Sequence, residues 1–119
     1  MHSCGIDIVK VSRIKDAIEA NDKFIKKVYS DDEIEYCNVK NVDQRYLHYA
    51  GRFAAKEAIY KALTNSEIKP EAWNTIEIIS LGGKLTKPIV RINGEILSNI
   101  DVSISHDTDY ATAVAILDK

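Results

Sequence analysis

The feature that most constrains this chain is a periodic run of small apolar residues near its middle. Apolar residues recur there at steps of three and four positions, namely at Leu47, Ala50, Ala54, Ala58 and Ala62. Such steps place side chains on one face of an α-helix. We therefore predict a long helix over residues 44–63 with a stripe of small residues along one face.

Shorter patterns on either side of this helix predict the remaining elements. Before it, we expect a strand at residues 4–9, a helix capped by Ser12, and a short helix that begins with the Ser30/Glu33 capping box. After it, we expect a hairpin of residues 75–81 and 88–92 around the Gly82-Gly83 turn, then strands at 100–105 and 110–117. This order indicates an α+β domain, with helices packed on a largely antiparallel sheet.

Composition describes one globular domain over residues 1–119 and excludes several classes of protein. The chain has 16 Lys plus Arg against 18 Asp plus Glu, so it lacks the basic footprint of a nucleic-acid-binding protein. It has neither a signal-peptide pattern nor an apolar run near the ~20 residues that a membrane span needs. Two cysteines, Cys4 and Cys37, are too few for a disulfide scaffold. We expect a cytosolic protein with no nucleic-acid or membrane partner.

The long helix also carries a carboxylate and an ammonium group one turn apart. Glu57 and Lys61 are four residues apart and are therefore neighbours on one helix face. One interpretation is an exposed ion pair, which contributes roughly a few tenths of a kcal/mol. In the other, the carboxylate holds a hard cation and the lysine neutralises phosphate bound to that cation. Periodicity alone favours the first interpretation.

Two further residues admit both a structural and a chemical interpretation. Asp7 lies between Ile6 and Ile8 in a predicted strand, where aspartate is disfavoured. It faces solvent, caps a nearby backbone group, or joins Glu57 in a Mg²⁺ site whose other ligands are phosphate and water oxygens. His106 follows the strand at 100–105 and is either a turn histidine bonded to the backbone or a functional group, as a donor to phosphate or in proton transfer. The residues alone leave both questions open.

Three motifs can be read together. They are Gly-Ile-Asp-Ile-Val at 5–9 with Arg13 shortly after, Gly-Arg-Phe-Ala-Ala-Lys-Glu-Ala-Ile-Tyr-Lys-Ala-Leu at 51–63, and Val-Ser-Ile-Ser-His-Asp at 102–107. In order and spacing they resemble the holo-acyl-carrier-protein synthase family, the short trimeric class of 4′-phosphopantetheinyl transferases. The resemblance covers nearly the whole chain. It implies the transferase fold and a homotrimer with its sites between subunits, which suits a chain too small for a deep cleft of its own.

The resemblance also implies an activity and roles for particular residues. The family transfers 4′-phosphopantetheine from coenzyme A to a serine of apo-acyl carrier protein, in fatty acid biosynthesis, and releases adenosine 3′,5′-bisphosphate. Carried over, Asp7 and Glu57 would hold Mg²⁺ with the coenzyme A diphosphate, and Lys61 would contact the phosphates and stabilise the leaving group. Arg52 and His106 resemble positions near the nucleotide's phosphates and are assigned to coenzyme A. The general base stays open between Glu57 and Asp7, each acting through a metal-bound water.

The resemblance further implies a carrier-binding surface and shows one departure from the family pattern. The family meets its acidic carrier with a basic first helix, which makes Arg13 the leading carrier contact. The departure is Thr64-Asn65-Ser66, which stands where the family often has a Gly-Thr-Gly turn; asparagine can still adopt the left-handed conformation. The alternative function is a non-catalytic module of the same fold that binds coenzyme A or the carrier.

Overall fold

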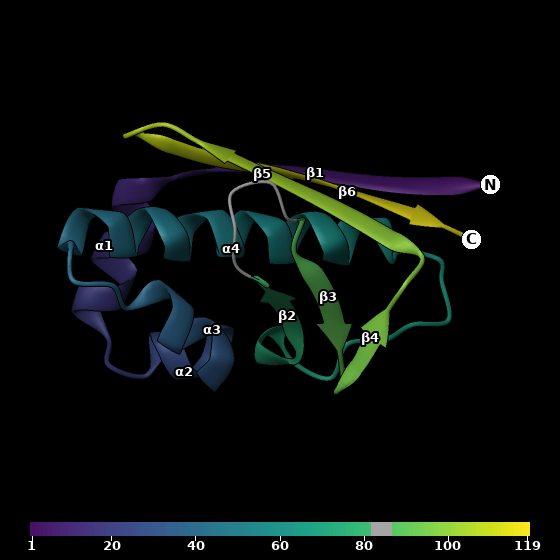
Figure 1. Cartoon of the computed structure of the whole chain (residues 1–119), viewed down its shortest axis with the longest axis horizontal. Helices are drawn as coiled ribbons and strands as arrows, with labels where there is room; N and C mark the ends of the chain where they lie inside the picture. The colour runs from purple at the N-terminus through teal and green to yellow at the C-terminus, as the bar shows by residue number, and fades with distance from the viewer. Residues whose placement is uncertain (82–86) are drawn as a thin grey trace.

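The structure, a computed structural model, describes residues 1–81 and 87–119 (Figure 1). In these ranges the chain forms two three-stranded antiparallel sheets with helices packed against them, so the predicted α+β class is confirmed. The elements are β1 (His2–Lys10), α1 (Val11–Ala20), α2 (Phe24–Val28), α3 (Asp31–Cys37), α4 (Val42–Ala62), the 3₁₀ turn η1 (Trp73–Thr75), β2 (Ile76–Ile79), β3 (Ile89–Ile92), β4 (Glu95–Leu97), β5 (Ile100–His106) and β6 (Tyr110–Asp118). The predicted Gly82-Gly83 turn lies outside the described residues.

The first sheet has the order β1-β6-β5 and lies along α4 (Figure 1). β1 pairs with β6 over its whole length, from His2↔Asp118 to Lys10↔Tyr110. The inward-facing side chains of the central strand β6 are all apolar. Three of them are small, Ala111, Ala113 and Ala115, and the fourth is Leu117. The predicted stripe Ala50, Ala54, Ala58 and Ala62 of α4 is fully buried. Small residues on both elements let the helix and sheet approach closely.

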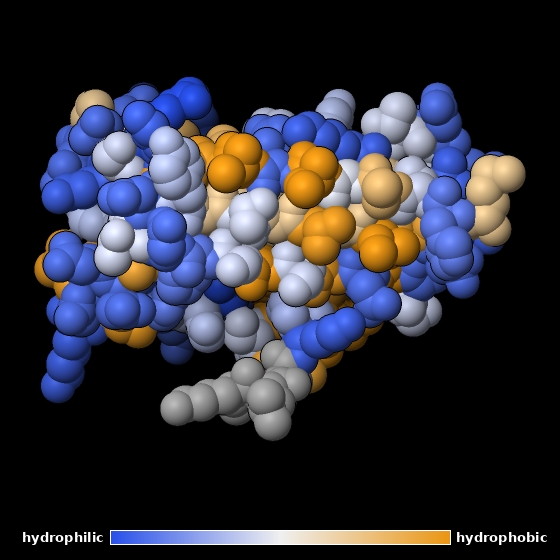
Figure 2. Space-filling view, turned by 90° about the horizontal axis from the view of Figure 1, so that it is seen from above, coloured by the Kyte–Doolittle hydropathy of each residue, from blue (hydrophilic) through white to orange (hydrophobic). Residues whose placement is uncertain are grey.

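The outer face of this sheet is apolar and uncovered. Figure 2 views the molecule from above and shows hydrophobic residues gathered over it. Ile6 and Ile8 of β1 are 66% and 65% exposed, and Val114 and Ile116 of β6 are also exposed. Ile6 is paired directly with Val114 in the ladder, so these side chains form one patch. We call this patch the outer apolar face.

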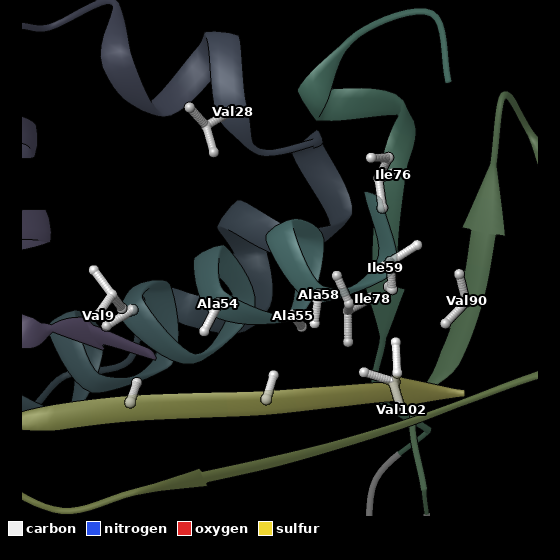
Figure 3. Packing of buried hydrophobic residues seen from close by; sticks show 14 of the residues in the cluster. Val9, Val28, Ala54, Ala55, Ala58, Ile59, Ile76, Ile78, Val90 and Val102 are labelled. Carbon is white, nitrogen blue, oxygen red and sulfur yellow. The ribbon is translucent and has the colours of Figure 1, made fainter. Parts of the chain in front are cut away.

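The second sheet, β2-β3-β4, closes the hydrophobic core on the other side of α4. Ile59 of α4 gathers there with Ile76, Ile78, Val90 and Val102 (Figure 3). β2 and β3 pair antiparallel, which confirms the predicted hairpin. Sequence analysis missed α2 and β4 because five and three residues are too few to show a period.

The starts of three helices can be compared with the sequence prediction. The Ser12 cap is wrong, because β1 runs directly into α1 and Lys10 occupies the cap position without a side-chain hydrogen bond. The capping box at α3 is confirmed, since the Ser30 hydroxyl accepts from the Glu33 amide and the Glu33 carboxylate accepts from the Ser30 amide. α4 begins at Val42, two residues earlier than predicted, because Asn41 caps it.

A buried ion pair fixes α4 against α3 and the second sheet. Lys56 and Glu33 are each 1% exposed, and Lys56 Nζ lies 2.6 Å from Glu33 Oε1. Lys56 also donates to the carbonyls of Trp73 and Ile76, while Glu33 Oε2 accepts from the Ile78 amide at 3.1 Å. Because both charges are hydrogen-bonded as well as paired, the burial is tolerated; removing one partner of such a pair typically costs about 3–5 kcal/mol.

Within residues 1–81 and 87–119, no helix combines the length and the apolar character needed to cross a membrane.

Candidate active site

Gly5 brings β1 into direct contact with the backbone of α4. A Cβ atom placed on Gly5 would lie 2.0 Å from the Ala58 carbonyl oxygen and 2.8 Å from Lys61 Cβ. No residue other than glycine can be accommodated at such distances without a shift of the backbone. Alternate residues of a strand share a face, so Asp7 follows Gly5 toward α4 while Ile6 and Ile8 point outward. The interpretation in which Asp7 faces solvent is wrong, since its side chain is only 18% exposed.

Asp7, Glu57 and Lys61 meet where β1 crosses α4. Lys61 Nζ lies 3.4 Å from Asp7 Oδ1 and donates to the Ile6 carbonyl at 2.8 Å. Among the described residues Lys61 therefore pairs with the strand and forms no ion pair with Glu57, which argues against the simple i,i+4 interpretation. Burial raises the pKa of Glu57, the negative charge of Asp7 raises it further, and Lys61 partly opposes the shift. The two carboxylates thus interact electrostatically.

The two carboxylates line one groove, of about 340 Å³, together with Arg13 of α1. Its other walls are mostly apolar and are formed by Ile8, Val9, Ile14, Ala17, Phe24 and Phe53. We call it the carboxylate groove. The repulsion between two neighbouring carboxylates is relieved when a divalent cation binds between them. Within residues 1–81 and 87–119 no third metal-binding side chain joins a group with them. A Mg²⁺ ion fits this site if phosphate and water oxygens complete its coordination.

Arg52 and His106 belong to a different cluster. Arg52 precedes Glu57 by five residues, which turns it about 140° around the helix, and it does not line the carboxylate groove. Its guanidinium Cζ lies 3.9 Å from the centre of the Tyr36 ring, and the Tyr36 ring lies 5.1 Å from the His48 ring. His106 ends β5, and the pKa of His48 is lowered by burial first and then by the neighbouring Arg52 and His106. We call Tyr36, His48, Arg52 and His106 the cationic cluster.

Sequence reasoning named Arg52 and His106 but did not single out Tyr36 or His48. His48 lies one turn before Arg52 on α4, so the i,i+4 spacing was a signal that could have found it. Tyr36 gave no such signal, because α3 reaches Arg52 only through tertiary packing. The Thr64-Asn65-Ser66 loop behaves as expected: Asn65 has a φ of +67°, in the left-handed region, directly after α4.

Comparison with known proteins decides the family. A family model described as the 4′-phosphopantetheinyl transferase superfamily matches residues 3–115. The chain belongs to this superfamily. It is therefore a transferase, and its curated relatives match it over nearly their whole length. The holo-[acyl-carrier-protein] synthase of Clostridium tetani is 42% identical to it over 122 residues, covering 96% of this chain and 93% of that protein. That of Aquifex aeolicus is 38% identical over 126 residues, covering 97% of both.

Solved structures of similar proteins agree with the fold of this transferase. The ACPS–CoA complex of Chronobacterium ammoniagenes has a TM-score of 0.79 and 26% identity, covering 99% of this chain and 97% of that one. The Bacillus anthracis synthase in complex with CoA (3′,5′-ADP) has a TM-score of 0.76 and 30% identity, covering 97% and 94% of the two chains.

The contact at Gly5 generates a stability prediction. Gly5→Ala must push β1 away from α4, and overpacking of this kind costs typically 1–3 kcal/mol in the free energy of unfolding. As β1 withdraws, the pKa of Glu57 should fall back toward its ordinary value, because Asp7 and the burial by β1 raise it. Urea unfolding and an NMR titration of the Glu57 carboxyl would measure both effects.

Gly51→Ala is the matched control, because its Cβ would meet only a side-chain methyl, Ile104 Cγ2, at 3.0 Å. Alanine in a helix also gains roughly 0.5–1 kcal/mol over glycine, which offsets that contact. Equal stability losses in the Gly5→Ala and Gly51→Ala variants would contradict the account of the β1–α4 contact.

Proposed function

We propose that this protein is a holo-[acyl-carrier-protein] synthase. It transfers 4′-phosphopantetheine from coenzyme A to a serine of apo-acyl carrier protein and requires Mg²⁺. The observation that carries the proposal is the meeting of Asp7, Glu57 and Lys61 where β1 crosses α4, with Asp7 and Glu57 lining the carboxylate groove. The names of the curated relatives and the coenzyme A complexes of similar structures support the same substrates. The cytosolic location expected from the sequence stays a prediction.

The reaction exchanges one phosphorus–oxygen bond for another. The serine hydroxyl oxygen bonds to the phosphorus that carries the pantetheine arm, and the bond from that phosphorus to the oxygen shared with the nucleotide's phosphate breaks. Adenosine 3′,5′-bisphosphate leaves with the bonding electrons, and the serine proton passes to one of the carboxylates, directly or through water. Phosphoryl transfer depends mainly on positioning and on neutralising charge.

Each residue of the carboxylate groove suits one part of this task. Asp7 and Glu57 would hold Mg²⁺, which when bound neutralises charge on the diphosphate. Lys61 donates to the Ile6 carbonyl and lies 3.4 Å from Asp7, so its ammonium group is oriented beside the two carboxylates before the substrate arrives. In that position it binds the diphosphate and stabilises the negative charge of the leaving nucleotide.

Arg13 and the apolar walls of the groove suit the carrier protein. Arg13 lies in the same groove as the two carboxylates, so a partner that it binds is held next to the reacting groups. Acyl carrier proteins are small and acidic, and an arginine attracts them electrostatically. Phe24 and Phe53 offer apolar contact area beside it.

The outer apolar face supports a homotrimer with its active sites between subunits. Ile6 and Ile8 expose about two-thirds of their surface, and covering such a patch is favourable at about 25 cal/mol per Å². The carboxylate groove and the cationic cluster use different sides of α4. We therefore propose that the diphosphate of one coenzyme A binds in the groove of one subunit and the rest of its nucleotide, with a further phosphate, binds Arg52 and His106 of a neighbour.

The activity is tested by mass spectrometry of apo-acyl carrier protein incubated with the protein, coenzyme A and Mg²⁺. The carrier should gain the mass of phosphopantetheine. Asp7→Asn and Glu57→Gln should each lower the rate by at least about 100-fold, because each removes a metal-binding charge. Glu35→Gln, a change at an exposed carboxylate of α3, serves as the control and should keep full activity.

No mass gain with any carrier tested would overturn the proposed function. Coenzyme A binding without transfer would instead support the non-catalytic alternative.

The carrier contact is tested with Arg13→Glu. The KM for the carrier should rise about tenfold, because attraction becomes repulsion, while the KM for coenzyme A stays unchanged. The effect should shrink at high ionic strength, where charges on the surface are screened. Lys40→Glu changes an exposed lysine that does not line the groove and should leave both constants unchanged. An unaltered KM for the carrier in the Arg13 variant would remove Arg13 from the interface.

A further inference from the structure

Lys61 is paired with one of the two carboxylates that would hold the metal. Its Nζ lies 3.4 Å from Asp7 Oδ1, whereas no ion pair joins Glu57 to any residue in the ranges 1–81 and 87–119. A divalent cation that binds both carboxylates has to share Asp7 with an ammonium group or displace it. Two cations beside one carboxylate repel each other. Lys61 therefore opposes the binding of a metal at Asp7.

Asp7 is the fixed member of this ion pair, and Lys61 is the adjustable one. Asp7 is paired with Ala113 of β6, and its backbone carbonyl accepts from the Thr112 hydroxyl at 2.8 Å. Its side chain is 18% exposed, whereas that of Lys61 is 51% exposed and ends a four-carbon stem with rotatable bonds. When another cation binds Asp7, the lysine is the group that moves.

A second contact keeps Lys61 at the site when the ion pair opens. Its Nζ donates to the Ile6 carbonyl at 2.8 Å as well as to Asp7. An ammonium group has three donors, so these two contacts within the described residues leave one donor for a further acceptor. A phosphate oxygen can therefore take over the ammonium group from Asp7 while Lys61 stays bonded to the strand.

The diphosphate of coenzyme A would thus help the metal in two ways. It offers oxygen ligands to the cation, and it draws the competing charge of Lys61 away from Asp7. We propose that Lys61 couples the two ligands of the active site, because it competes with Mg²⁺ for Asp7 until the diphosphate engages its ammonium group. The metal then binds tightly only together with coenzyme A, and by linkage it strengthens coenzyme A binding by the same factor. This inference rests on the proposed function and adds an order of loading to it.

The test measures Mn²⁺ binding to the full-length protein by electron paramagnetic resonance, with and without saturating coenzyme A. Mn²⁺ replaces Mg²⁺ because it favours the same oxygen ligands and can be followed spectroscopically. In Lys61→Met, the Kd for Mn²⁺ without coenzyme A should fall about tenfold, because the competing charge is gone. With coenzyme A the Kd should change less than about threefold, since in the unaltered protein the diphosphate has already taken Lys61 from Asp7.

Two further variants separate competition at Asp7 from other effects of charge. Lys61→Arg keeps a positive charge beside Asp7 and should bind Mn²⁺ like the unaltered protein. Lys69→Met removes an exposed lysine that forms no ion pair within residues 1–81 and 87–119, so it reports the effect of net charge alone. Its Kd for Mn²⁺ should change less than about twofold, because distant surface charges are screened.

Three results would overturn the inference. An unchanged Kd in Lys61→Met would show that Lys61 does not compete for Asp7, and an equal decrease with and without coenzyme A would show that the diphosphate does not move it. Failure of both proteins to bind Mn²⁺ would remove the metal from this site. The measurement without coenzyme A separates this inference from the proposed function, because it can succeed even if no phosphopantetheine is transferred.

Discussion

The site depends on the contact between β1 and α4 at Gly5. Because a Cβ there would lie 2.0 Å from the Ala58 carbonyl, strand and helix touch backbone to backbone. Asp7 lies on the same strand face, and Glu57 and Lys61 flank Ala58 in the helix sequence, so this one contact sets how the three side chains meet. The small residues Ala111, Ala113 and Ala115 of β6 continue the close approach along the sheet. The geometry of the proposed active site thus follows from the packing of two backbones against each other.

The opposite side of α4 is held by the buried Lys56–Glu33 pair. It ties the helix to α3 and to the carbonyls of Trp73 and Ile76, so α4 is restrained between two layers. Successive helix positions then serve different purposes. Lys56 anchors the helix, Glu57 faces the carboxylate groove, and Arg52 faces the cationic cluster. This helix carries several charged residues because each of these three positions has a different partner.

The regular spacing of apolar residues made α4 and the two faces of β1 predictable from the sequence. Helical spacing identified α4, and strand alternation placed Asp7 opposite Ile6 and Ile8. Alternation did not reveal which face of β1 meets the helix. The face with Ile6 and Ile8 would be expected to be buried, but it is the exposed one. Tyr36 escaped notice because it meets Arg52 only through tertiary packing of α3 on α4, whereas the i,i+4 spacing of His48 and Arg52 was visible in the sequence. The homotrimer implied by the resemblance stays a prediction.

The central claim is that one active site combines the carboxylate groove of one subunit with the cationic cluster of another. The sharpest test unfolds two variants, Glu57→Gln with a defective groove and Arg52→Gln with a defective cluster, and refolds them together; each alone should transfer poorly. Every subunit then has either an intact carboxylate groove or an intact cationic cluster. When the two variants assemble at random, about a quarter of the interfaces bring an intact groove together with an intact cluster. The account predicts that transfer activity recovers toward that fraction. A mixture no more active than its separate components would contradict it, because every single-subunit site would still contain a defect.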